Sequence, residues 1–72
     1  MTLSEHLSQA YGSLAMGKRP IAEVVAAFAA DAAGNPDLIT EAHAEMDRLT
    51  DSITERCVIS RAHRDFLRLA LA

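Results

Sequence analysis

Apolar residues recur at intervals of three or four positions through most of the chain, a period that predicts α-helices. Thr2 and Glu5 have the spacing of a capping box, in which each side chain binds the other residue's backbone N–H. Gly17 can adopt the left-handed conformation that ends many helices. We therefore predict a first helix between Thr2 and Gly17. Its apolar stripe consists of Leu3, Leu7, Ala10, Tyr11 and Leu14.

The second apolar run is rich in alanine. Pro20 can begin this helix. Proline lacks a backbone N–H, and an N–H in the first turn of a helix has no intrahelical acceptor in any case. Seven of the twelve residues from 22 to 33 are alanine, which has the highest helix propensity and lets a neighbouring helix approach closely. We predict that this segment is the central and most buried helix. Its apolar stripe consists of Ile21, Val24, Val25, Phe28 and Ala32.

A strong boundary signal separates the second helix from the third. Gly34 can end one helix, and Asn35 can cap the next, with Pro36 in its first position. Asp37 then lies at the positive end of the helix dipole. The core stripe of this third helix is predicted to be Leu38, Ala42, Met46 and Leu49, with Glu41, Glu45, Asp47 and Arg48 towards water.

The sequence around Thr50 and Ser52 allows two interpretations. Ser52 and Glu55 could form a second capping box that starts a fourth helix at Ile53. Alternatively, the spacing of Leu49, Ile53 and Cys57 could continue the third helix without a break. We favour a break or kink. The predicted fold is therefore all-α, a single domain of residues 1–72 in an array or bundle of three to four helices.

The last segment combines a wide apolar arc with positive charge. Residues 1–51 contain three basic and eight acidic side chains, whereas residues 52–72 contain four basic and two acidic ones. The apolar arc is wider than the stripe a surface helix needs. The segment is therefore either the core helix or a helix that also docks a partner. For the docking interpretation, the predicted apolar anchors are Val58, Ile59, Phe66, Leu67 and Leu71, and the charged rim is Arg61, Arg64 and Arg68.

Composition excludes several classes of protein. The net charge of −3 does not favour general phosphate binding, and no apolar run approaches the ~20 residues of a membrane span. A single cysteine forms no intrachain disulfide, and no secretory signal precedes it, so we expect a cytoplasmic protein. A domain of 72 residues usually gains only about 3–5 kcal/mol from its core. A protein partner or a homodimer is the expected supplement.

The residues that could carry chemistry are scattered. His6, His43 and His63 lie on three different segments and lack the short spacings of a zinc site, so we predict surface or half-buried histidines. Cys57 is predicted to lie mid-helix as a small buried hydrophobic residue. The glycines form no phosphate-binding loop. We therefore predict no catalytic site, no metal and no cofactor.

Part of the chain resembles the short bacterial anti-sigma domains of the ChrR and RsrA kind. The similar features are Ala10-Tyr11, the turn Leu14-Ala15-Met16-Gly17 and the helix with Val24-Val25-Ala26, within roughly residues 7–50. The resemblance implies a fourth helix that clamps a sigma factor. The zinc ligands of that family would fall near Phe28, Ala32 and Asn35, none of which binds zinc. The resemblance therefore implies a version without zinc.

These patterns predict a non-enzymatic regulatory or adaptor protein that binds a protein partner through its helices. One concrete form is an anti-sigma-like or anti-activator regulator of transcription. The alternative is a helical protein that binds nucleic acid through the C-terminal arginines. A helix-turn-helix made of Ala30 to Gly34 and a second helix that starts at Pro36 is disfavoured. That second helix would carry Asp37, Glu41, Glu45 and Asp47 towards phosphate.

Overall fold

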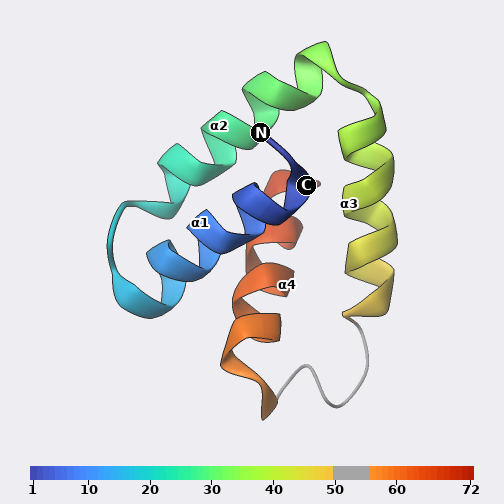
Figure 1. Ribbon diagram of the computed structural model, residues 1–72. Coiled ribbons are helices and arrows are strands. Elements are labelled where there is room, and N and C mark those ends of the chain that lie inside the picture. The colour runs from blue at the N-terminus through green and yellow to red at the C-terminus, as the bar shows by residue number, and fades with distance from the viewer. Residues whose placement is uncertain (50–55) are drawn as a thin grey trace.

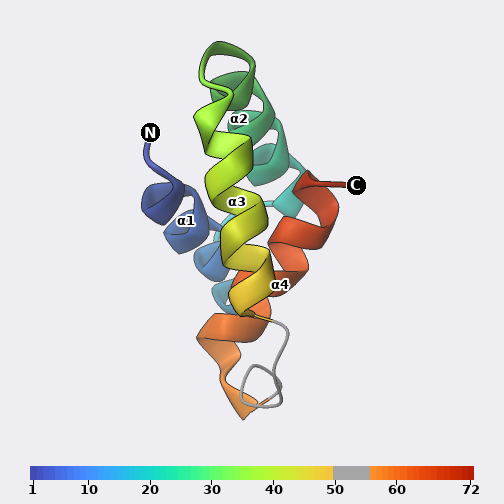
Figure 2. The ribbon, with the colours of Figure 1, turned by 90° about the vertical axis from the view of Figure 1, so that its right-hand side faces the viewer.

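The computed structural model describes residues 1–49 and 56–72, which form four helices and confirm the all-α prediction. These are α1 (Leu3–Met16), α2 (Ile21–Gly34), α3 (Asp37–Arg48) and α4 (Val58–Ala70). In Figure 1, α1 crosses α4, and α2 follows a tight turn. Figure 2 shows α3 running along the length of the molecule in front of the other helices, and it packs against α1, α2 and α4. The arrangement is a small array of crossing helices.

The predicted signals at both ends of α1 are confirmed. The Thr2 hydroxyl accepts a hydrogen bond from the Glu5 N–H at 3.2 Å, and the Glu5 carboxylate accepts one from the Thr2 N–H at 3.1 Å. Gly17 is left-handed, with φ 66°, and the Lys18 N–H donates to the Gly12 carbonyl at 3.1 Å. These bonds satisfy backbone groups that would otherwise have no partner at a helix end.

The core lies where all four helices meet. Phe28 and Phe66 are fully buried and meet edge to face, with ring centroids 5.7 Å apart. The predicted α3 stripe is confirmed, since Leu38 and Ala42 are buried and Met46 packs against the core. The buried members of the core are Leu7, Ala10, Val24, Phe28, Leu38, Ala42, Leu49, Phe66 and Leu67.

The prediction that the alanine-rich helix is the most buried one is wrong. In α2 only Val24 and Phe28 are buried, whereas α4 buries Ala62, Arg64, Phe66 and Leu67. Alanine favours a helix on either a buried or an exposed face, so its abundance does not fix the burial of α2. The exposed alanines of α2 are Ala22, Ala26, Ala29, Ala30 and Ala33.

The third and fourth helices are separate, as favoured from the sequence. α3 ends at Arg48, and α4 begins at Val58 after an extended Cys57 with φ −108° and ψ 116°. The proposed start at Ile53 and the capping box of Ser52 and Glu55 lie outside the described residues. Cys57 is therefore not mid-helix, as predicted, but is the half-buried residue immediately before α4.

Candidate protein-binding surface

The structure divides the predicted apolar anchors between the core and the surface. Phe66 and Leu67 are fully buried, so the prediction that they contact a partner directly is wrong. They lie on the side of α4 that faces the other helices, where Phe66 packs on Phe28. Leu71 is half-buried and packs against the same core. Val58 and Ile59, by contrast, are about half exposed.

The predicted arginine stripe is interrupted at its centre. Arg64 is buried, and its guanidinium donates from Nε and Nη2 to the Asp65 carboxylate at 3.3 and 3.2 Å. Arg61 and Arg68 are exposed and form no ion pair with a described residue. The alternative of nucleic-acid binding thus stays a prediction that rests on two exposed arginines in place of three.

A hollow of about 280 Å³ lies between the second half of α1 and the first half of α4. Leu14 and Ala15 border it from α1, and Val58 and Ala62 border it from α4. Arg61 and the Arg64–Asp65 pair provide its charged edge. Leu14, which we predicted in the core stripe of α1, is instead exposed at the edge of this hollow.

A second hollow of about 390 Å³ lies where α2 meets the other end of α4. Its lining is almost entirely apolar and includes Leu69 of α4. Val58, Ala62, Asp65 and Leu69 are spaced four, three and four residues apart, so they lie along one side of α4 and connect the two hollows. We call this surface the α4 flank. It comprises Leu14, Ala15, Ile21, Ala22, Val25, Ala26, Ala29, Val58, Arg61, Ala62, Arg64, Asp65 and Leu69.

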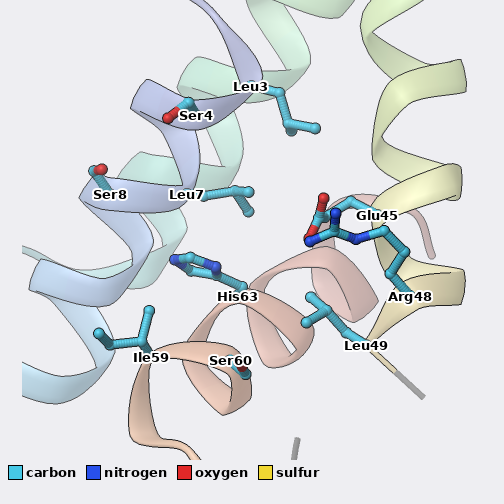
Figure 3. A pocket seen from close by; sticks show the side chains of 10 residues that line it. All are labelled: Leu3, Ser4, Leu7, Ser8, Glu45, Arg48, Leu49, Ile59, Ser60 and His63. Atoms are coloured by element: carbon cyan, nitrogen blue, oxygen red, sulfur yellow. The ribbon is translucent and has the colours of Figure 1, made fainter. Parts of the chain in front are cut away.

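A larger hollow, about 480 Å³, lies on another side, between α1, α3 and α4 (Figure 3). Glu45 and Arg48 extend into it from α3 and pair with each other at 3.0 Å. His63 enters from α4, and partial burial lowers the pKa of its imidazole, while the Glu45 charge opposes this shift. Figure 3 shows Leu3 and Leu7 pointing towards α3 and Ser4 pointing away from it. Glu45 and Arg48 therefore neutralise each other, and α1 lines the hollow with two leucines and two serines: Leu3, Ser4, Leu7 and Ser8.

His6 differs from the predicted surface or half-buried histidine, because its side chain is fully buried. Its Nε2 lies 2.7 Å from the Asp31 carboxylate, and its ring meets Phe28 edge-on at 5.5 Å. An ionised carboxylate only accepts hydrogen bonds, so Nε2 carries the proton. Nδ1 is buried and has no partner among the described residues. The hydrogen bond from His6, helped by the N-terminal amine, lowers the pKa of Asp31.

The Cys57 thiol lies at the start of α4. Hydrogen bonds from the Ser60 side chain and backbone lower its pKa, and the charge of Arg61 acts in the same direction. These are the conditions under which a thiolate forms more readily. Cys57 is not part of the lining of any hollow described above.

Residues 1–49 and 56–72 contain neither a cluster of metal-binding side chains nor a helix that could span a membrane. No three metal-binding side chains (His, Cys, Asp or Glu) lie together in these parts of the chain. None of the helices there has the length and apolar content that crossing a membrane requires.

No protein-family model, curated protein or solved structure matches the chain. The resemblance to anti-sigma domains therefore stays a prediction that rests on Ala10-Tyr11, the turn at residues 14–17 and Val24-Val25-Ala26.

Proposed function

We propose that this chain is a non-enzymatic regulatory or adaptor protein that binds a helix of another protein on the α4 flank. The observation that carries the proposal is the exposure of three large apolar side chains along this one surface. Leu14 is 42% exposed, Val58 51% and Leu69 53%. They come from the end of α1 and both ends of α4, with smaller apolar residues of α2 beside them.

Burial of these residues would strengthen a partner complex. Covering a half-exposed Leu or Val side chain contributes roughly 1 kcal/mol. Apolar side chains that are exposed together beside charged residues are typical of binding sites, whereas single exposed apolar residues are ordinary. The hollows lie between helices, a shape that suits an amphipathic helix better than a flat surface.

Control of transcription is one concrete form of this proposal. The family that the chain resembles uses its fourth helix to hold a sigma factor, and here α4 contributes the central side of the flank. An anti-sigma-like or anti-activator role is supported by that resemblance and by the position of the exposed residues. The absence of the zinc ligands at Phe28, Ala32 and Asn35 fits the apolar core around Phe28.

Photo-crosslinking inside the cells that naturally produce the protein tests the proposal. A benzophenone amino acid is placed at Val58, and at the exposed Glu41 of α3 as the control. We expect one discrete protein adduct from position 58, and its loss when Leu69→Gln is added. Circular dichroism checks that each variant keeps its helices. Absence of the adduct at position 58, or equal adducts from positions 58 and 41, would contradict the proposal.

A further inference from the structure

We propose that the helix bound on the α4 flank carries two carboxylates about two turns apart, one on each side of a position that is not acidic. This inference rests on the proposed function and adds the chemistry of the partner. It follows from the order of charges along the edge of the flank.

Arg61 and Arg68 supply the two positive positions. They are seven residues apart, so they lie on the same edge of α4, separated along its axis by about 10 Å. Both side chains are exposed, and neither forms an ion pair with a described residue. A carboxylate pair at the same spacing on a facing helix would meet both guanidinium groups at once.

Asp65 lies between the two arginines, and its negative charge disfavours a partner carboxylate at this position. Its side chain is half exposed, and it borders the first hollow while pairing with Arg64. A partner carboxylate opposite Asp65 would be repelled by a like charge. The flank therefore selects for a pattern of acidic, neutral or basic, then acidic residues, which a uniformly acidic helix does not match.

The same charges argue against two other occupants. In a symmetric contact between two copies, each copy brings Arg61 and Arg68 to the shared interface but only one carboxylate, Asp65, which already pairs with Arg64. Binding to an anionic lipid surface is disfavoured because the chain has a net charge of −3 and because the flank is hollowed, whereas a membrane surface is flat.

Two designed helical peptides of about five turns test the inference. Both carry the same leucine stripe. One has glutamates at two edge positions seven residues apart, and the other has lysines there. Fluorescence anisotropy with the full chain measures the two dissociation constants at low and at high ionic strength. We expect the glutamate peptide to bind at least about tenfold more tightly at low salt, with the difference shrinking as salt screens the charges.

Variants of the chain identify the surface involved. Arg61→Glu combined with Arg68→Glu should reverse the preference between the peptides, whereas Lys18→Glu, a reversal of one charge outside the flank, should preserve it. Because all three residues are exposed, the folds should be retained, and circular dichroism confirms this.

Each other outcome overturns the inference in a distinguishable way. Equal binding of both peptides, abolished by Val58→Asp, would leave the proposed function standing without charge selection. A dimer in sedimentation that Val58→Asp dissociates would make a second copy the occupant. Binding to phosphatidylserine vesicles that depends on Arg61 and Arg68, without peptide binding, would make it a lipid surface. If neither peptide binds, the inference fails, and crosslinking at position 58 decides the proposed function separately.

Discussion

Asp31 links α2 to the buried His6 of α1 and gives the fold a pH dependence. The hydrogen bond from His6 lowers the pKa of Asp31 in the folded chain. The folded state therefore binds a proton on the Asp31 carboxylate less tightly than the unfolded state does. The resulting stability is present above the ordinary aspartate pKa of about 3.9 and is lost as the pH falls through the lower, folded value.

Asp31→Asn should accordingly destabilise the chain at neutral pH, and the difference from the parent should shrink as the pH falls below about 4. Urea unfolding at a series of pH values measures the free energy of unfolding of the variant and of the parent. Glu41→Gln on the exposed face of α3 controls for the loss of one negative charge. A difference that stays constant from neutral to acidic pH would show that the carboxylate charge does not act through His6.

His6 also shows what the sequence could not reveal at the scale of one residue. Its partner Asp31 is 25 positions away, on a different helix, so neither spacing nor local composition relates them. Arg64 is a second case, because its place in a stripe of arginines indicated a solvated rim. In both cases burial depends on how two helices cross, and this crossing is not encoded in either helix alone.

Gly17 and Gly34 stand at the ends of neighbouring helices but have different conformations. Gly17 has a φ of 66°, where a side chain is strained, whereas Gly34 is the last residue of α2 and would place a new Cβ in open space. We therefore expect Gly17→Ala to lower the free energy of unfolding by roughly 1–2 kcal/mol. Gly34→Ala should leave it unchanged or raise it by about 0.4–1 kcal/mol.

Thermal and urea unfolding of the two variants against the parent measure these changes. The two substitutions add the same methyl group, so each serves as the control for the other. Equal destabilisation by both would mean that the left-handed turn after α1 does not distinguish them.

Local chemical signals predicted both ends of α1, whereas the prediction that Asn35 caps α3 is wrong, because Pro36 occupies the N-cap and no side chain caps that helix. The capping box and Gly17 placed α1, and Pro36 placed the start of α3 close to its observed bound at Asp37. The start of α4 at Val58 was missed because neither glycine nor proline marks it. The burial of α2 was misjudged for another reason, since alanine favours a helix without specifying what covers it.

At the scale of the whole molecule, α4 packs in the core on one side and exposes apolar residues on another, which is the side that we propose for docking. One side supplies Phe66 and Leu67 to the core, and the adjoining side forms the flank between α1 and α2. A small domain has few helices with which to cover apolar surface, so its central helix is also partly a surface helix. The wide apolar arc seen in the sequence is the sum of these two faces.

This double role predicts that a chain ending at Asp51 does not fold. Removing residues 52–72 takes Phe66 and Leu67 away from Phe28, and losing even one buried Phe typically costs about 3–5 kcal/mol, comparable to the whole reserve of a domain this small. We expect the fragment to lack a cooperative thermal transition by circular dichroism. The full chain with Val58→Asp and Leu69→Gln, which alters only exposed side chains of α4, should keep one. If the fragment melts cooperatively, α1, α2 and α3 form a core of their own, and α4 is an appended binding helix.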